Sequence, residues 1–189
     1  RPFDTRYIIY DNDKLQRSRV KTLKHMLEEN LCLCISKRSK SNPTSLVTPY
    51  LISKHLITDA TYAFPVYQYE DDNNNHRIDD IREPILPYGD EDVPKRKPNF
   101  TKKFSQYFNS LYKHAYKPEQ ILGYIYAILY SPTYRTKYIE FLKIDFPRIP
   151  FVDDEKLFLE ISGAGAELIE HHLMKRDYEE NICRMKGEG

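Results

Sequence analysis

The sequence predicts an α+β fold, in which a mixed α/β N-terminal half with a small β-sheet precedes an α-helical C-terminal half. Two patterns predict it: apolar residues alternate with a period of two before residue 70 and recur at helical spacing after residue 98. Aromatic residues make up 13% of the 189 residues, with 16 Tyr, 9 Phe and no Trp. Disordered chains are poor in aromatic residues, so the 30% of charged residues does not indicate disorder.

The first two elements are predicted to be a strand and a helix. Residues 6–10 are rich in Tyr and Ile and precede an Asp-Asn-Asp turn, which indicates a short strand. Residues 16–27 change to helical spacing, with an apolar stripe formed by Val20, Leu23 and Leu27. Four cations fall within about 80° of one another on another face of that helix: Lys14, Arg17, Lys21 and Lys24.

The rest of the N-terminal half is predicted to be β-structure. Residues 30–38 alternate with a period of two and are apolar on both faces, which is typical of a buried strand. Residues 46–58 and 62–69 are further runs of strand-forming residues, and Pro49 and Pro65 mark edges or irregularities in them.

The C-terminal half begins with two predicted helices. Residues 100–111 place five apolar side chains on one side: Phe100, Phe104, Tyr107, Phe108 and Leu111. The next helix begins at Lys117-Pro118-Glu119, because Pro suits the first helical position and an acid suits the first turn. Residues 123–130 are apolar nearly all round, so we expect them at the buried centre of this half.

Two more helices follow. Ser131-Pro132 begins a helix that ends before two prolines, Pro147 and Pro150, and its inward stripe is Tyr134, Tyr138, Phe141 and Leu142. Asp153 and Asp154 are predicted to cap the last helix, which extends to about Lys175. Its inward residues are Leu157, Ile161, Leu168 and Ile169. With the low-apolar, Pro-rich segment 70–98 as a loop or linker, the parts are residues 1–69, 70–98 and 99–189.

The net charge of +1 hides an uneven distribution. Residues 1–69 carry 11 Lys and Arg against 6 Asp and Glu, and residues 70–93 carry 2 against 9. Residues 94–189 carry 16 against 13, and residues 95–117 hold seven Lys and Arg and no acid. An acidic loop therefore masks two basic regions, and the net charge does not exclude nucleic acid. An ordinary solvated surface with one acidic insertion explains the charge equally well.

Other features limit the class of protein. No apolar run approaches the roughly 20 residues that span a bilayer, and no secretory signal opens the chain. Three Cys, an odd number, argue against a disulfide framework and for a reducing cytosol, so we expect a cytoplasmic location. No small-molecule substrate is indicated.

The candidate catalytic motifs are weak. Cys32-x-Cys34 lacks the spacing of a zinc knuckle and is better explained by packing. His171 and His172 point about 100° apart on a helix, which is poor geometry for one metal ion. Gly163-x-Gly165 follows no strand, so close helix packing explains it better than a phosphate loop. The sequence therefore predicts no catalytic residue, no metal ligand and no cofactor in this chain.

The sequence supports a DNA-binding role better than a catalytic one. For residues 36–42, however, residue types alone favour an ordinary solvated loop slightly over a DNA-reading loop. A specific reader needs cations for phosphates and polar side chains on short loops for base edges. The base-reading candidates lie at two predicted loops: Lys37, Arg38, Ser39, Lys40, Asn42, Lys54 and His55. The phosphate candidates are Arg17, Lys21, Lys24, Lys95, Arg96, Lys97, Lys102 and Lys103.

Four stretches carry a resemblance to a known family. They are the opening RPFDTRYIIYD, the strand NLCLCISKR, the strand YAFPVYQY, and the late ILGYIYAILYSPTYRTKYIEFLKIDFPRIPF with LFLEISGAGAELIEHHL. Together they resemble the C-terminal specificity region of type ISP single-polypeptide restriction–modification enzymes and related N6-adenine DNA methyltransferases. The resemblance covers almost the whole chain. It implies a target-recognition part, with residues 1–69 as its reading half.

The resemblance implies a partner domain that this chain lacks. In such proteins an N6-adenine methyltransferase domain uses S-adenosylmethionine, sometimes with a helicase and a nuclease, in bacterial defence. No Asn-Pro-Pro-Tyr motif or glycine-rich cofactor loop is present, so we expect a C-terminal fragment that is not itself an enzyme. The implied partners are double-stranded DNA and the methyltransferase domain. The alternative is a protein–protein docking module within the same enzyme.

Some residues allow a functional and a structural interpretation. Arg148 suits an ion pair with an acid such as Asp145 better than a phosphate contact, and Phe146 and Phe151 suit packing on the helical core. In the opening motif, Arg6 could pair with Asp4 or face DNA. The tyrosines at helical spacing fit a core better than base stacking: Tyr124, Tyr126, Tyr130, Tyr134 and Tyr138.

Overall fold

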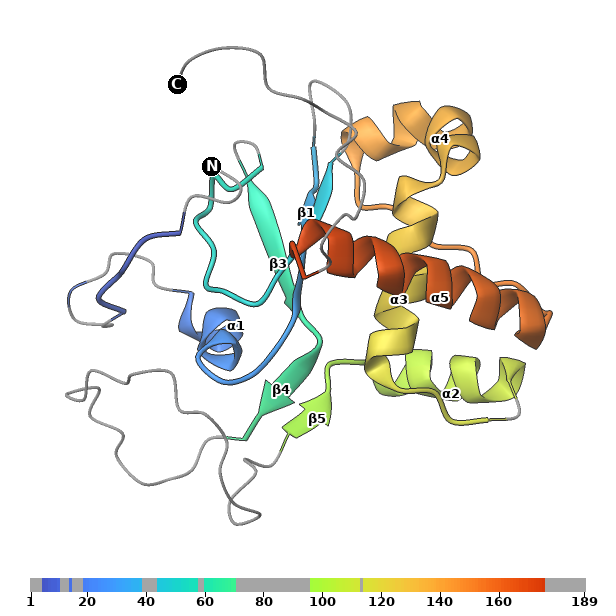
Figure 1. Ribbon diagram of the computed structural model, residues 1–189, viewed down its shortest axis with the longest axis horizontal. Helices are drawn as coiled ribbons and strands as arrows, with labels where there is room; N and C mark the ends of the chain where they lie inside the picture. The colour runs from blue at the N-terminus through green and yellow to red at the C-terminus, as the bar shows by residue number, and fades with distance from the viewer. Residues whose placement is uncertain are drawn as a thin grey trace.

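A computed structural model places strands in the N-terminal half and helices in the C-terminal half, which confirms the predicted α+β fold (Figure 1). It describes residues 5–10, 14, 19–38, 44–57, 60–70, 96–112 and 114–175. The N-terminal elements are α1 (Val20–Leu23), the 3-10 turn η1 (Lys24–Met26), β1 (Cys32–Ser36), β2 (Ser45–Thr48), β3 (Thr61–Pro65) and β4 (Tyr67–Tyr69). The later ones are β5 (Arg96–Pro98), α2 (Lys102–Leu111), α3 (Pro118–Tyr130), α4 (Pro132–Ile144) and α5 (Glu155–His172).

β1 is the central strand of a three-stranded antiparallel sheet with the order β2-β1-β3. Its residue Leu33 lies opposite Val47 of β2 and Phe64 of β3. A second, two-stranded sheet pairs β4 with β5, so that Tyr67 lies opposite Pro98. Pro65 ends β3, as expected of a proline that cannot donate to a ladder.

Alternation along β1 divides its side chains between two cores. Leu33 and Ile35 pack in a core that also contains Leu122 and Tyr126 of α3, so the two halves share apolar contacts. Cys32 and Cys34 point to the other face, where they are buried with Met26 of η1. The packing interpretation of the two thiols is confirmed, since both are free and fully buried.

The helical half has its own aromatic core around Phe158 of α5. Five buried residues form it: Phe108, Tyr112, Ile121, Tyr124 and Phe158. Its helices begin where their caps predict, because Pro118 opens α3, Ser131 caps α4 and Asp154 caps α5. Tyr124, Tyr126 and Tyr134 are buried, which confirms the core interpretation for these tyrosines.

The first two predicted elements are wrong in part. Residues 6–10 form no strand, because Tyr7, Ile8 and Ile9 are exposed and no half-buried surface supports them. Within the described residues 19–27, the helix predicted over 16–27 is limited to α1 and η1, and Arg19 just before α1 has left-handed backbone angles (φ 51°, ψ 39°). Leu27 lies beyond η1 and is exposed, whereas Leu23 of the predicted stripe is buried and Val20 is partly buried.

The end of the predicted loop 70–98 is also wrong. Arg96–Pro98 form β5, which pairs with β4 and returns the chain to the N-terminal half. Residues 71–95 lie outside the described residues, so the order of that loop stays untested. The division into three parts likewise stays a prediction.

Several inward positions of the helices differ from prediction. Phe141 is 69% exposed, because Tyr138 departs from helical angles (φ −113°, ψ 15°) and turns the end of α4. Leu157 is partly exposed, and Asp153 does not cap α5. Gly163 faces open space, whereas a Cβ on Gly165 would lie 1.8 Å from the carbonyl oxygen of Gly123 in α3.

Candidate nucleic-acid interface

Three of the predicted phosphate-binding lysines lie around one hollow in the N-terminal half. Lys21 and Lys24 come from α1 and η1, and Lys97 comes from β5. The hollow, which we call the basic depression, has a volume of about 400 Å³. Its other described lining residues are His25, Gln68, Tyr69 and Glu70. Side chains more than 70 residues apart in sequence therefore meet at one surface.

Buried Asn30 holds the elements of the basic depression together. Its side-chain amide donates to the carbonyls of His25 (2.9 Å) and Tyr67 (2.9 Å). Its side-chain oxygen accepts from the backbone N–H groups of Leu31 (2.9 Å) and Tyr67 (3.1 Å). The backbone N–H of Tyr69 also donates to the ring of His25, at 3.1 Å from Nδ1. β4, and β5 paired to it, are thus fixed beside η1.

Arg96 is held by aromatic residues at the edge of this region. Its guanidinium lies 4.2 Å from the ring centroid of Tyr67. A hydrogen bond with Tyr69 raises the pKa of Arg96. The Tyr67 hydroxyl donates to Oε1 of Glu119 at 2.7 Å, and burial together with this bond raises the pKa of Tyr67 to about 12. Arg96, one of the predicted phosphate contacts, therefore also connects β5 to the start of α3 through Tyr67 and Glu119.

The end of β1 is anchored at Lys37. The Lys37 ammonium lies 3.5 Å from Oδ1 of Asp145 and 5.4 Å from the ring centroid of Phe146. A hydrogen bond from the backbone N–H of Phe146, followed by the charge of Lys37, lowers the pKa of Asp145. Asp145 is therefore paired with Lys37 rather than with the predicted Arg148.

Arg38 is the last described residue before a gap at residues 39–43. Ser36 donates from its hydroxyl to the carbonyl of Arg38 at 2.6 Å, and the side chain of Arg38 is exposed. Phe146 packs against Tyr62 and Phe64 of β3 and also, as predicted, against the core that contains helical residues such as Leu122. Phe151 stacks on Tyr124, also as predicted. The remaining candidates of this loop, with two phosphate candidates, lie outside the described residues: Ser39, Lys40, Asn42, Arg17 and Lys95.

The second predicted finger, Lys54 and His55, lies on an exposed turn before β3. Lys54, but not His55, borders a smaller pocket of about 100 Å³ together with Arg19. Arg19 is not among the predicted contacts, because it falls outside the four-cation stripe. Its place between two predicted phosphate contacts, Arg17 and Lys21, was the available signal. Lys102 and Lys103 are exposed at the start of α2 and line neither hollow.

An apolar groove separates the sheet from the helices. It has a volume of about 400 Å³ and lies between β1, β3, the start of α3 and residues 146–149. Apolar side chains dominate it, among them Leu33, Phe64 and Leu122. Sequence reasoning missed this groove, because it depends on how the two halves pack.

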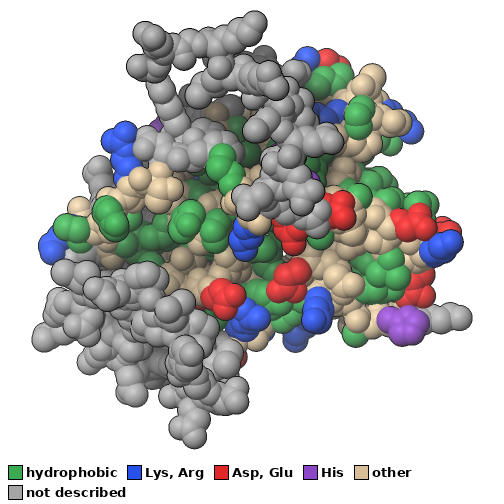
Figure 2. Space-filling view, viewed as in Figure 1, with side chains coloured by type: hydrophobic (Ala, Val, Ile, Leu, Met, Phe, Trp, Pro, Cys, Tyr) green, Lys and Arg blue, Asp and Glu red, His purple; other side chains and the backbone are tan. Residues whose placement is uncertain are grey.

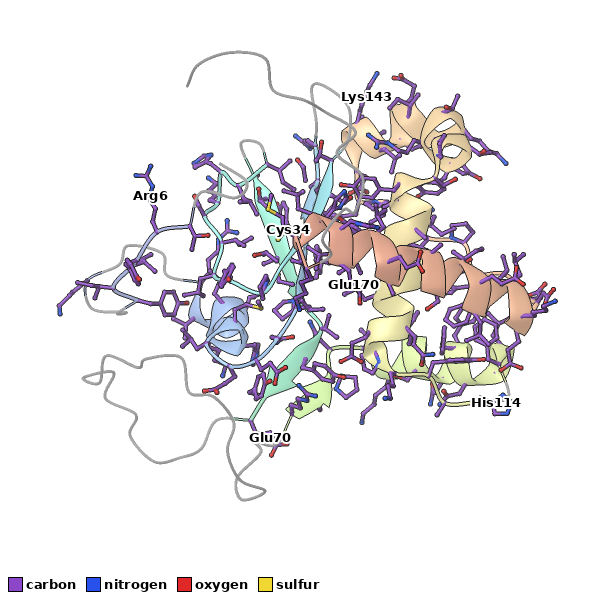
Figure 3. The ribbon with its side chains drawn as sticks, viewed as in Figure 1. Arg6, Cys34, Glu70, His114, Lys143 and Glu170 are labelled. Carbon is purple, nitrogen blue, oxygen red and sulfur yellow. The ribbon has the colours of Figure 1, made fainter. Side chains whose placement is uncertain are left out.

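Among the described residues, Glu70 is the one acidic residue that lines the basic depression. On the face drawn in Figure 2, most Asp and Glu lie over the helical half. Figure 3 shows Glu70 at the end of β4 and Arg6 on the N-terminal segment, at the margin of the molecule. Among the described residues, no group of three or more His, Cys, Asp or Glu could hold a metal ion. No helix in the described ranges is long and apolar enough to cross a membrane.

Three solved structures similar to this chain contain DNA or a DNA substrate mimic, and two of them are described as Type ISP restriction–modification enzymes. The cryo-EM structure of a DrdV–DNA complex matches 76% of the chain with 27% identity and a TM-score of 0.57. The Type ISP enzyme LlaBIII bound to DNA matches 90% with 22% identity and a TM-score of 0.62, which supports the fold alone. A nuclease-deletion mutant of the Type ISP enzyme LlaGI, with a DNA substrate mimic, matches 77% with 24% identity and a TM-score of 0.50.

The whole chain, residues 1–189, matches the family described as the Type ISP C-terminal specificity domain. The chain belongs to this family, and the resemblance seen in its sequence motifs is confirmed. It covers 12% of the DrdV chain and 10% of the LlaGI and LlaBIII chains, about a tenth of their length. No curated protein matches the sequence.

Proposed function

We propose that this domain reads a specific sequence in double-stranded DNA for a bacterial restriction–modification enzyme. Its membership of the specificity-domain family supports a role in target recognition. The DNA complex of DrdV, which is 27% identical over the matched part, supports duplex DNA as the partner.

The basic depression is the observation that carries this proposal. Lys21, Lys24 and Lys97 present ammonium groups around one hollow, although they come from two distant segments. Ammonium groups grouped in this way suit the non-bridging oxygens of a phosphate backbone, which fix the register of a protein on a duplex. Asn30 joins η1 to β4 through hydrogen bonds to His25 and Tyr67, and β4 pairs with β5, so the backbone segments that carry the three lysines are held together.

Base reading is assigned to the loop that follows β1. Arg38 is exposed directly after Lys37, and Lys37 is fastened to Asp145 and Phe146. Because Lys37 is held, the exposed Arg38 next to it is well placed for bidentate contact with a guanine edge in the major groove. Ser39, Lys40 and Asn42 would supply further contacts from the same loop, with Lys54 and His55 as a second finger.

The chemistry is assigned to a domain outside this chain. A methyltransferase domain would bind S-adenosylmethionine, flip the target adenine out of the duplex and methylate its N6 atom. The present domain would hold the DNA while that happens. The expected location is the bacterial cytoplasm, where the DNA is.

A second candidate role is docking onto the rest of the same enzyme. Tyr7, Ile8 and Ile9 are consecutive large apolar residues, with exposed fractions of 108%, 61% and 72%. Uncovered apolar side chains favour a protein interface. The two roles make different predictions, because docking alone leaves the enzyme's DNA affinity independent of the basic depression.

The test compares Arg38→Ala with Lys24→Ala in the full-length enzyme. Lys24→Ala should weaken binding to all duplexes alike and reduce the slope of log affinity against log salt by about one. Arg38→Ala should instead relax specificity at one base pair, at a cost of about 1–3 kcal/mol. Fluorescence anisotropy at several salt concentrations, with methylation of cognate and single-mismatch sites, measures both effects. Unchanged binding and methylation in both variants would show that the DNA surface is misassigned.

A further inference from the structure

The smaller pocket that Arg19 and Lys54 border lies beside the basic depression. We call it the Arg19–Lys54 pocket. Its volume is about 100 Å³, and nine described residues line it: Arg19, Thr22, Leu23, Ile52, Ser53, Lys54, Thr61, Tyr62 and Ala63. None of these nine is acidic, whereas Glu70 lines the basic depression. The pocket therefore combines two cations and hydroxyl groups without a neutralising carboxylate in its lining.

Thr61 contacts the side chain of Arg19 and the backbone of Lys54. Its carbonyl accepts from Nη1 of Arg19 at 3.5 Å, and its backbone N–H donates to the carbonyl of Lys54 at 2.8 Å. Thr61 is the first residue of β3 and is only 1% exposed, so both contacts are made to the rigid sheet. Its hydroxyl also accepts from the backbone N–H of Ile57 at 3.0 Å. One buried residue thus positions groups that are 35 residues apart.

The turn that carries Lys54 is also held locally. The backbone N–H of Leu56 donates to the carbonyl of Ser53 at 3.2 Å. The backbone N–H of His55 donates to the hydroxyl of Ser53, also at 3.2 Å. These bonds define the backbone of the turn, so Lys54 is presented from a fixed position beside Arg19 rather than from a loose loop.

The lining matches the chemistry of a phosphodiester. Arg19 and Lys54 can hold the non-bridging oxygens, because a charged donor bonds an anionic oxygen about twice as strongly as a neutral one. The hydroxyls of Thr22 and Ser53 add polar partners on the same wall. Leu23, Ile52 and Ala63 form the apolar part of the lining, which suits the adjoining deoxyribose carbons.

The place of the pocket ties it to the basic depression. Arg19, Thr22 and Leu23 line the pocket, while their neighbours Lys21, Lys24 and His25 line the depression. The short α1–η1 segment is therefore a ridge with cations on both sides. Two cationic hollows across one ridge suit two phosphates of one DNA strand, with the ridge resting between them.

We propose that Arg19 and Lys54 together bind a single backbone phosphate of the target DNA. The inference rests on the proposed function, since it needs duplex DNA as the ligand. It adds Arg19 to the interface and changes the role of Lys54 from reading a base to holding a phosphate. Thr61 is the positioning residue of this contact.

The test combines protein variants with neutralised phosphates. Full-length enzyme, Arg19→Gln and Lys54→Gln are titrated against cognate duplexes in which one phosphate at a time is a methylphosphonate. Wild-type enzyme should lose about tenfold in affinity at each phosphate that it contacts, the size expected for a hydrogen bond to a charged group, and one of these positions is the phosphate held by Arg19 and Lys54. Each variant should bind the unmodified duplex about tenfold more weakly and become insensitive to methylphosphonate at that same position only.

Lys156→Gln is the matched control. Lys156 is 86% exposed at the start of α5, at the opposite end of the molecule from α1 in Figure 1. This variant should keep the wild-type pattern at every position. Specificity between cognate and mismatched sites should stay unchanged in Lys54→Gln, because a phosphate contact carries no sequence information.

The outcomes separate the two proposals. If wild-type enzyme binds the cognate duplex but the two variants lose sensitivity at different positions, or at none, the shared phosphate is wrong and the recognition role stands. Relaxed specificity at one base pair in Lys54→Gln would return Lys54 to base reading and also overturn the inference. If wild-type enzyme does not distinguish the cognate duplex from other DNA, the recognition role and the inference fail together.

Discussion

Gly165 and Gly123 allow the backbones of α5 and α3 to touch. A Cβ on Gly165 would lie 1.8 Å from the carbonyl oxygen of Gly123, and a Cβ on Gly123 would lie 2.6 Å from the carbonyl oxygen of Ser162. Both obstacles are backbone atoms, which cannot rotate away as a side chain can. The hydroxyl of Ser162 donates to the carbonyl of Gln120 at 2.7 Å and closes the same contact. The aromatic core therefore depends on two positions that carry no side chain.

Gly165→Ala should destabilise the domain by at least about 1–3 kcal/mol, the usual cost of overpacking a core. The added methyl group must push α5 away from α3, and Tyr124 and Phe158 lose their packing with it. Gly163→Ala is the matched control, because nothing lies within 4 Å of a Cβ at that position. Alanine there should be neutral or stabilise by up to about 1 kcal/mol. Equal losses in urea unfolding of the two variants would contradict this account.

The beginning of α5 shows how a short sequence signal positions a whole helix. Oδ1 of Asp154 accepts from the backbone N–H groups of Lys156 (2.9 Å) and Leu157 (3.4 Å). Asp153, next to it, makes no such cap. The first turn of α5 lies over the aromatic core, where Tyr116 donates to Glu155 at 2.5 Å. The cap therefore stabilises a helix end that other elements contact.

Asp154→Ala should lower the free energy of unfolding by about 1 kcal/mol, because two backbone donors lose their acceptor. Asp153→Ala should change it by a few tenths at most, which reflects only the charge near the helix N-terminus. Thermal unfolding followed by circular dichroism compares the two variants at the same pH. A larger loss in Asp153→Ala than in Asp154→Ala would show that the cap is wrongly placed.

The elements that sequence predicted best carry their own boundary signals. Pro118, Ser131 and Asp154 each open a helix for a reason that is local to the chain, and all three were foreseen. The strand predicted over residues 6–10 is wrong, because strand-forming side chains indicate a strand only where another surface half-buries them. The strand Arg96–Pro98 was missed for the converse reason, since its partner β4 is distant in sequence and supplies the pairing.

Prediction of the candidate interface is also limited by contacts between residues that are distant in sequence. The residue types of Lys21, Lys24 and Lys97 suggested phosphate contacts, but their meeting at one hollow depends on β5 and on Asn30. Helical spacing places Arg19 outside the four-cation stripe, and the left-handed backbone that departs from this spacing is visible only in the structure. Sequence therefore indicated which cations to consider, and tertiary contacts decided which of them share a site.

At the scale of the whole molecule, tyrosine hydroxyls connect distant elements. Three of them donate to backbone carbonyls of the segment between α4 and α5: Tyr112 to Val152 (2.6 Å), Tyr124 to Pro150 (2.7 Å) and Tyr134 to Arg148 (2.8 Å). Two others join the halves, Tyr130 to the carbonyl of Ser45 (2.6 Å) and Tyr67 to Glu119 (2.7 Å). A chain with 16 Tyr and no Trp thus uses its aromatic residues as hydrogen-bonding braces as well as core.

The hydrogen-bonded tyrosine hydroxyls predict that the domain loses stability in alkaline solution. Burial raises the pKa of Tyr112 to about 12, and burial with the Glu119 bond raises that of Tyr67 to about 12. An unfolded tyrosine releases its proton near about pH 10, whereas these folded ones retain it. Between about pH 10 and 12 the unfolded state therefore binds fewer protons, so the free energy of unfolding falls as pH rises and is unaffected by these groups below about pH 9. Urea midpoints measured across this range should fall steadily.

Tyr112→Phe separates the tyrosine effect from the titration of surface lysines over the same range. Without its hydroxyl, the variant should be less stable at neutral pH by about 1 kcal/mol, because the carbonyl of Val152 loses its donor. Phenylalanine cannot ionise, so the further loss between about pH 10 and 12 should be smaller than in wild type. Lysine titration is identical in the two proteins and cancels in the comparison. Parallel pH dependence of the two urea midpoints would mean that Tyr112 ionises in the folded domain as it does in the unfolded chain, and that its brace does not control alkaline unfolding.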